Sequence, residues 1–315
     1  MDPVQIELGI RAILGMASRV HVEVEGRELV LSNLDKVLYP AAGFRKADVI
    51  DYYRRIGPVM LDHLAGRPPT LVRAPDGPGG ERFFEKRCPP HRPDWVPTEA
   101  VVAGGGQQGC VIQELPALVW LANLAALELH THQWTVADPA HPTAVVLDLD
   151  PGDGATVIDC ARVAIEIRDV LDRFDLLAVV KTSGGKGLHL SLPLNTDAAT
   201  HEDTKRFALA LGQLLESRDP KRVTVDMAKE RRTRRVFVDW SQNDSFKTTV
   251  CAYSLRIRER PTVSTPVSWD EVEATIDGDD PDALTFETAD VVDRVVEHGD
   301  LYADALTVRQ TLPAL

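Results

Sequence analysis

The sequence has few cysteines, no long apolar run and no excess of basic residues. The cysteines lie far apart without paired spacing, so neither a disulfide framework nor a zinc site of four cysteines is indicated, and we expect reduced, structural thiols. They are Cys88, Cys110, Cys160 and Cys251. Charged residues interrupt every candidate membrane span, and no N-terminal segment has the apolar core of a signal peptide. The expected location is the cytoplasm.

The charge balance is acidic, with 48 Asp and Glu against 35 Lys and Arg and a net charge of -13. This excess argues against a protein that coats nucleic acid through the electrostatic field of the whole molecule. It does not exclude a local basic groove. A basic run precedes one strand-like segment, and it comprises Lys229, Arg231, Arg232, Arg234 and Arg235. Alone, such a run is more often a solvated surface than a nucleic-acid site.

Apolar material is plentiful, because hydrophobic residues make up 44% and charged residues 26% of the 315 residues. This composition is typical of a globular protein. Chains of this length can fold as one compact unit. We expect a single two-lobed catalytic domain over residues 20–315, preceded by an N-terminal appendage over residues 1–19.

Hydrophobic periodicity predicts alternating strands and helices. Residues 20–31 alternate as a hairpin does, and helical spacing runs from Lys46 to Leu64, where Pro58 should kink or split the helix. Other predicted elements are helices at 157–174, 204–215 and after Pro266, a buried helix or helix–strand pair at 115–129, and strands at 145–149, 176–181, 188–192, 236–240 and 248–255.

The strongest local signal is the segment V-V-L-D-L-D-P-G, which contains Asp148 and Asp150. Two aspartates at i and i+2 on a strand point the same way and can share one cation, for which magnesium or manganese is suited. In an isolated D-x-D motif, a pair of solvated acids is about equally frequent.

Three enzyme classes compete for this motif. A haloacid-dehalogenase-type phosphatase would need Thr or Val where Gly152 stands, and a glycosyltransferase would leave the later motifs unexplained. A two-metal nucleotidyltransferase needs a third carboxylate from another strand. Asp239, at the end of R-V-F-V-D-W, is the candidate.

Possible phosphate ligands follow the acidic strand. The segment T-S-G-G-K-G-L-H combines Ser183, Lys186 and His189 with flexible glycines, as a phosphate cradle does, although it is not a Walker P-loop. Cationic and polar donors near Asp239 could converge on a polyphosphate, and these are Gln242, Lys247 and Arg256.

Two further motifs are open to two interpretations. His130 follows a buried segment and on base rates is a boundary histidine rather than a phosphate ligand, while His132 is expected to be structural. Phe83 and Phe84 form either a short core strand or an exposed stacking platform for a base, and composition favours the core.

Taken together, these motifs resemble those of the bacterial primase-polymerases of the archaeo-eukaryotic primase superfamily, which includes the polymerase domain of the end-joining DNA ligase D. The similarity runs from about Leu31 to Gly299. Its markers, in order, are L-S-N-L-D-K-V-L-Y-P, F-F-E-K, L-E-L-H, V-L-D-L-D-P-G, T-S-G-G-K-G-L-H, V-F-V-D-W-S-Q-N, K-T-T and Y-S-L-R.

The resemblance implies a two-lobed α/β (α+β) fold whose catalytic sheet is related to the RNA-recognition motif. It also implies template-directed, metal-dependent nucleotide addition that prefers ribonucleotides. The expected roles are two Mn²⁺ or Mg²⁺ ions on Asp148, Asp150 and Asp239, and nucleotide binding by Ser183, Lys186, His189, His130, Gln242, Lys247 and Arg256.

For DNA, the resemblance implies that Lys36 and Lys46, with Asn33, hold a downstream 5'-phosphate, and that Phe83 and Phe84 stack beside the template. Val72 stands where we expect a basic residue in ligase-linked relatives. No ligase or nuclease region follows, so we expect a stand-alone polymerase at the nucleoid that fills gaps or joins ends with a separate ATP-dependent DNA ligase and Ku. A non-catalytic DNA-end-binding module and a sugar-nucleotide transferase are the alternatives.

Overall fold

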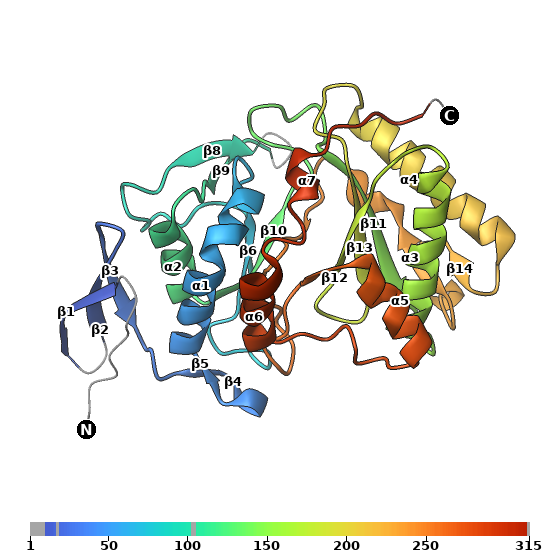
Figure 1. Cartoon of the computed structure of the whole chain (residues 1–315). Helices are drawn as coiled ribbons and strands as arrows, with labels where there is room; N and C mark the ends of the chain where they lie inside the picture. The colour runs from blue at the N-terminus through green and yellow to red at the C-terminus, as the bar shows by residue number, and fades with distance from the viewer. Residues whose placement is uncertain (1–9, 17–18, 102–104, 314–315) are drawn as a thin grey trace.

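The computed structural model describes residues 10–16, 19–101 and 105–313, and Figure 1 shows two lobes side by side. The first lobe is built mainly from the N-terminal half of the chain and the second mainly from residues after 144. Each lobe has its own cluster of buried apolar side chains. The predicted two-lobed α/β (α+β) fold is therefore confirmed. Within the described residues, no helix is long and apolar enough to cross a membrane.

The chain begins with a three-stranded antiparallel meander of β1 (Ile10–Met16), β2 (Arg19–Val24) and β3 (Arg27–Ser32). Strands β2 and β3 form the predicted hairpin, with Glu25 and Gly26 at its turn in left-handed backbone conformations. Strand β1 adds to it from within the segment that we expected to be an appendage.

The first lobe contains a four-stranded antiparallel sheet in the order β16-β10-β6-β7. Its strands are β6 (Thr70–Arg73), β7 (Phe83–Glu85), β10 (Ala126–Thr131) and β16 (Thr249–Val250). Smaller elements are β4 (Val37–Tyr39), η1 (Pro40–Ala42), β5 (Phe44–Arg45), β8 (Thr98–Val101) and β9 (Gln107–Cys110). Helix α2 (Leu115–Asn123) precedes β10, so the apolar segment is a helix–strand pair.

Helix α1 (Lys46–Leu64) packs against α2 in the first lobe. Contrary to one of our expectations, Pro58 does not split it. Pro58 lies on the exposed side, whereas Tyr53, Ile56 and Met60 on the other side are almost fully buried. Burial of these large side chains outweighs the hydrogen bond that the proline cannot donate.

The second lobe contains a six-stranded sheet in the order β14-β15-β11-β13-β12-β17. All its strand pairs are antiparallel except β14–β15. The strands are β11 (Ala144–Pro151), β12 (Val179–Thr182), β13 (Leu188–Pro193), β14 (Val223–Thr224), β15 (Val236–Asp239) and β17 (Pro266–Val267). The predicted hairpin with a glycine-rich tip is β12–β13.

Helices cover one face of this sheet: α3 (Val157–Asp172), α4 (His201–Arg218) and α5 (Trp269–Gly278) (Figure 1). Thr156 and Thr200 cap the first two through side-chain oxygens that accept backbone N–H groups. Short 3-10 turns η3 (Lys229–Arg231) and η4 (Trp240–Asn243) flank β15. The helices leave the opposite face of the sheet free for the site.

The acidic C-terminal region forms the expected helices, α5 and then α6 (Thr288–His298) and α7 (Asp304–Thr307). Between the last two, Asp300 accepts hydrogen bonds from Tyr253 at 2.6 Å and contacts His63 Nε2 at 2.9 Å. These contacts fasten the C-terminal segment to helix α1. The predicted strand 248–255 is wrong beyond β16, because the chain turns after Val250.

Two of the four cysteines form a disulfide, which corrects the expectation of four reduced thiols. Cys88 and Cys110 are bonded, with their Cα atoms 4.7 Å apart, whereas Cys160 and Cys251 are free and buried. The amide of Cys88 also donates a 2.7 Å hydrogen bond to the carbonyl of Gln108 on β9. A sequence separation of 22 residues does not indicate that the two cysteines are close. They come together because β9 folds back beside the segment after β7.

Candidate active site

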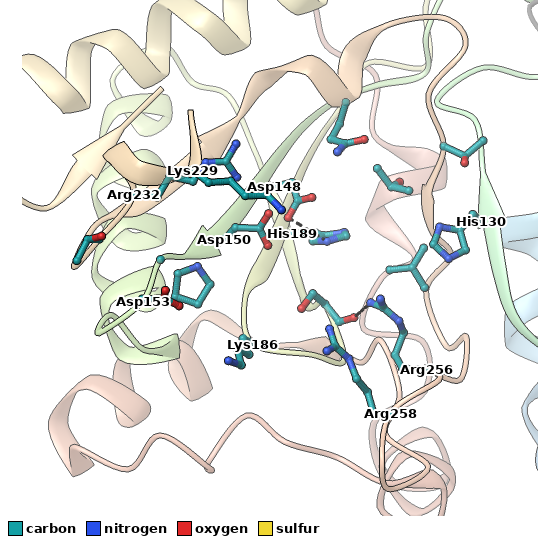
Figure 2. A pocket seen from close by; sticks show the side chains of 18 residues that line it. His130, Asp148, Asp150, Asp153, Lys186, His189, Lys229, Arg232, Arg256 and Arg258 are labelled. Carbon is teal, nitrogen blue, oxygen red and sulfur yellow. Dashed lines mark hydrogen bonds and ion pairs between the residues drawn. The ribbon is translucent and has the colours of Figure 1, made fainter. Parts of the chain in front are cut away.

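The two aspartates of the D-x-D motif lie on the sheet face that is turned away from the helices. Val145, Leu147 and Leu149 of β11 pack in the core of the second lobe. Alternation along the strand therefore places Asp148 and Asp150 on the opposite face. Both line a cavity of about 460 Å³ (Figure 2).

Asp239 stands directly opposite Asp148 on the antiparallel neighbour β15. Directly opposite residues place their side chains on the same face of a sheet, so the third predicted carboxylate lies on the same face as the other two, although Asp239 is not among the described residues that line the cavity. Its Oδ1 accepts hydrogen bonds from the amide and hydroxyl of Ser241 at 3.0 and 2.6 Å, and its Oδ2 accepts one from Gln242 Nε2 at 2.8 Å. Gln242 itself lines the cavity.

Crowding of the carboxylates changes their acidity. Burial, followed by the charges of Asp148 and Asp239, raises the pKa of Asp150 to about 7. Burial also opposes ionisation of Asp148, but the neighbouring His189 and Lys181 outweigh it and hold the pKa of Asp148 below its usual value. Carboxylates whose pKa values are pushed apart in a cleft are typical of active sites.

The oxygen donors of this set fit a divalent cation. Asp148 Oδ1 is buried without a hydrogen-bond partner, although His189 Nε2 lies 3.2 Å away. An unsatisfied buried carboxylate oxygen is costly, and a cation would satisfy it while relieving the repulsion on Asp150. Over the described part of the chain, no group of three His, Cys, Asp or Glu side chains is arranged to hold a metal ion. The oxygen chemistry of the aspartates, rather than their spacing, is what suits a divalent cation.

The glycine-rich tip between β12 and β13 is folded tightly onto its own serine. Ser183 Oγ accepts hydrogen bonds from the amides of Gly185 at 3.2 Å and Gly187 at 3.1 Å. Gly187 approaches β11 so closely that a Cβ there would lie 2.1 Å from the carbonyl oxygen of Leu149. The tip thus presents Ser183, the exposed Lys186 and the buried His189 to the cavity, while two of its amides are already used.

Glu128, for which the sequence predicts no role, holds two of the predicted nucleotide ligands. Its carboxylate contacts His130 Nε2 at 2.8 Å and Arg256 Nε at 3.1 Å, and it accepts the amide of Ile257 at 2.7 Å. Burial opposes its ionisation, but these partners lower the pKa of Glu128 to about 2. One acid in an otherwise apolar segment was the signal that could have revealed it.

The basic run and the second arginine of Y-S-L-R-x-R supply a cationic wall. Lys229 and Arg232 line the cavity on one side of the aspartates, and Arg256 and Arg258 line it on the other (Figure 2). Arg256 also donates to the carbonyl of Ser183. The lining has five Lys and Arg side chains and three Asp side chains, so the site is locally cationic in an acidic chain.

His132 and Lys247 are not among the described residues that line the cavity. His132 is buried, stacks on Trp134 at 4.5 Å between ring centroids and contacts the carbonyl of Lys247 at 3.1 Å. Burial lowers the pKa of His132 to about 4, in keeping with its expected structural role.

The predicted 5'-phosphate residues come together at the start of α1. The amide of Lys46 donates to the carbonyl of Lys36 at 2.8 Å, and that of Lys36 donates to Asn33 at 3.1 Å. Lys36 Nζ pairs with Asp76 at 2.6 Å, while Lys46 Nζ donates to the carbonyl of Ser32 at 2.7 Å. Burial, then the charges of Lys36 and Arg73, lower the pKa of Lys46 to about 8.

The aromatic pair on edge strand β7 is exposed, so the expectation from composition that it forms core is wrong. Phe83 is 40% and Phe84 71% exposed. Large exposed aromatics on a strand edge are unusual in a solvated surface and common in surfaces that stack bases.

Comparison with known proteins points to one family. The model of the LigD primase-polymerase domain matches residues 45–302. The multifunctional non-homologous end joining protein LigD of Mycolicibacterium smegmatis is 41% identical over 276 residues, covering 87% of this chain and 35% of that protein. The bifunctional LigD of Bacillus subtilis is 30% identical over 277 residues, covering 88% and 44%. The chain thus spans less than half the length of these relatives.

Among solved structures, the polymerase domain of Mycobacterium tuberculosis ligase D in complex with DNA is similar with a TM-score of 0.81 and 39% identity. The similarity covers 90% of this chain and 99% of that one. The chain therefore belongs to the LigD primase-polymerase family, a family of nucleotidyltransferases.

Proposed function

We propose that this chain is a template-directed repair polymerase that adds nucleotides, preferentially ribonucleotides, to a primer 3'-hydroxyl at gaps or broken DNA ends. One observation carries the proposal: Asp148 and Asp150 open into the same cavity as Lys186, Arg256 and Arg258. A nucleoside triphosphate requires carboxylates that hold its metal cations and cationic side chains that bind its phosphate oxygens. The cavity has both, on opposite sides.

The cavity has room for the nucleotide. Its volume of about 460 Å³ lies within the range of about 300–1,000 Å³ that is usual for small-molecule sites. Arginines suit phosphate oxygens because their planar donors bind two oxygens at once. We assign Arg256, Arg258 and Lys186 to the triphosphate, with Ser183, His189 and His130 beside the sugar or phosphates and Lys247 as an outer donor.

The aspartates hold the reaction centre. We assign Asp148, Asp150 and Asp239 as ligands of two Mn²⁺ or Mg²⁺ ions, which when bound would activate the primer hydroxyl and neutralise the leaving pyrophosphate. Ser241 and Gln242 fix the Asp239 carboxylate through three hydrogen bonds, so its orientation is set before any ligand arrives. Such preorganisation lowers the cost of reaching the transition state.

The DNA contacts lie on the first lobe. Lys36, Lys46 and Asn33 are assigned to a 5'-phosphate on the downstream strand, and Phe83 and Phe84 to stacking beside the template. A terminal phosphate carries more charge than an internal diester, so a pair of lysines can select it.

The names of the relatives support the repair pathway that we propose. Their names place them in non-homologous end joining, and the solved polymerase domain was found with DNA. We propose that this chain acts at the nucleoid with an ATP-dependent DNA ligase and Ku, in end joining or in gap repair.

Primer extension tests the function. The native protein is incubated with a labelled primer on gapped, nicked and overhanging duplexes, with Mn²⁺ or Mg²⁺ and each nucleoside triphosphate. Templated extension of the gapped substrate supports the proposal. DNA binding without extension under every condition would instead identify a non-catalytic end-binding module.

A further inference from the structure

Lys181 on β12 is a buried lysine that none of the sequence motifs explains. It is only 4% exposed, and within the described residues it has no carboxylate partner within ion-pair distance. Its Nζ lies 3.0 Å from His189 Nδ1 and 2.7 Å from Ser264 Oγ. A lysine so placed is costly to bury, so its neighbours indicate what it does.

Sheet register explains the arrangement. Lys181 stands opposite His189 on β13, and His189 stands opposite Asp148 on β11. With Asp239 on β15, the four residues form one polar row across four neighbouring strands. Lysine, histidine and aspartate are therefore held in line by backbone pairing.

The hydrogen positions in this row follow from the end that Lys181 occupies. The Ser264 hydroxyl donates to the carbonyl of Thr182 at 2.8 Å, so its lone pairs are free to accept from Lys181. Lys181 Nζ also donates to His189 Nδ1, and a neutral imidazole whose Nδ1 accepts carries its one N–H on Nε2. That nitrogen lies 3.2 Å from Asp148 Oδ1, but the two atoms do not form a hydrogen bond in the free protein.

His189 borders two cavities. It lines the large cavity of the site, and together with Lys181 it lines a second cavity of about 60 Å³. A side chain that borders two cavities has fewer packing neighbours than one inside the core, so a polar anchor from Lys181 helps to fix its position.

We propose that Lys181 is a positioning residue that holds His189 as the neutral Nε2–H tautomer, with this N–H on the side of Asp148 and the large cavity. A donor fixed in this way is available to a phosphate or sugar oxygen of the incoming nucleotide. The inference deepens the proposed function and rests on it for the identity of the nucleotide, but the tautomer itself is a property of the free protein.

The first test is nitrogen-15 NMR of the native protein labelled at histidine, without nucleotide or metal. The sequence has nine histidines, so the His189 signals are identified by their loss in His189→Gln. We expect the Nε2–H pattern at pH 7.5. An Nδ1–H pattern for His189 overturns the proposal, whether or not the protein extends primers.

The second test compares Lys181→Met with Lys221→Met, since Lys221 is an exposed lysine that does not line the cavity. Lys181→Met should change the His189 signals and raise the KM for the nucleoside triphosphate about tenfold, with a smaller fall in kcat and unchanged DNA affinity. Ser264→Ala, which removes the other Lys181 partner, should shift the same His189 signals if Lys181→Met does not fold. Unchanged signals in both Lys181→Met and Ser264→Ala would refute the anchoring role.

Discussion

Asp148 and Asp239 face each other across the β11–β15 strand pair, and the same register sets Asp150 opposite Phe237. The guanidinium of Arg232 stacks on Phe237, with 3.6 Å from its carbon to the ring centroid. This pair of strands therefore carries all three carboxylates, two of which, Asp148 and Asp150, line the cavity. Arg232 lies in the turn before β15 and also lines the cavity. Backbone pairing fixes the three carboxylates before any ligand binds.

Removing either facing carboxylate should stop nucleotide addition. Asp148→Ala and Asp239→Ala are expected to lower the rate of primer extension on the order of a thousandfold or more, because the metal-bound transition state needs all three acids. DNA affinity should stay close to that of the native protein. The matched control is Asp153→Ala, an acid that lines the same cavity but lies outside the facing set. Near-native extension by either variant would rule out the assignment.

Much of this site could be predicted from sequence because strand alternation is local. The run before Asp148 is apolar and ends in an acidic turn, and the hairpin that carries His189 is marked by its glycines. For Asp239, the sequence indicates only a plausible third acid at the end of another strand. The strand register that places it opposite Asp148 comes from the structure.

Other features could not be predicted because they depend on tertiary packing. Pro58 remains inside α1 because the buried face of that helix outweighs one lost hydrogen bond. The roles of Glu128 and Lys181 arise only when separate strands place their partners beside them. A lone acid or lysine in an apolar segment indicates burial with a partner, but not which partner.

Glu128→Gln should weaken nucleotide binding without preventing folding. The amide can still accept the Ile257 N–H, but it loses the charge that holds Arg256 and His130. We expect the dissociation constant of the nucleoside triphosphate to rise about tenfold, since hydrogen bonds to charged groups contribute about 1.5–3 kcal/mol. The control is Glu114→Gln, an acid that pairs with Arg27 away from the cavity. Equal affinities for native protein and Glu128→Gln would contradict the role given to Glu128.

The sugar of the incoming nucleotide provides a separate prediction. Ribonucleotides should be incorporated with a higher kcat/KM than the matching deoxyribonucleotides on the same gapped duplex. The measurement is steady-state extension by one nucleotide, with each base tested in both sugar forms. Equal or reversed efficiencies would refute the preference and leave the polymerase assignment intact.

The disulfide can be tested by counting thiols. Alkylation of the unfolded protein without reductant should label two cysteines, Cys160 and Cys251, and reduction should raise the number to four. In the chain-entropy model, a bond across a loop of this separation contributes about 3 kcal/mol. Cys88→Ser and Cys110→Ser should therefore lower Tm by similar amounts, and the double variant by no more than either. Four labelled cysteines before reduction would show that the pair is not bonded.

The last prediction concerns how an acidic protein selects a DNA end. If Lys36 and Lys46 hold a 5'-phosphate, the native protein should bind a gapped duplex more tightly when its downstream strand is phosphorylated. The Lys36→Ala, Lys46→Ala double variant should lose this difference, while binding to both duplexes still weakens as salt rises. The comparison is a titration of both duplexes at one fixed salt concentration.

The burial of Lys46 adds a pH dependence to this discrimination. Its pKa is lowered to about 8, so its ammonium is largely present at pH 7 and largely lost at pH 9. A neutral amine attracts a phosphate far less, and the preference for the phosphorylated duplex should therefore shrink between these values. The Lys46→Arg variant stays charged throughout, so any preference that it retains for the phosphorylated duplex should not change with pH. If the native protein binds both duplexes alike at pH 7, the two lysines do not form a phosphate pocket, and such a pocket must be sought elsewhere.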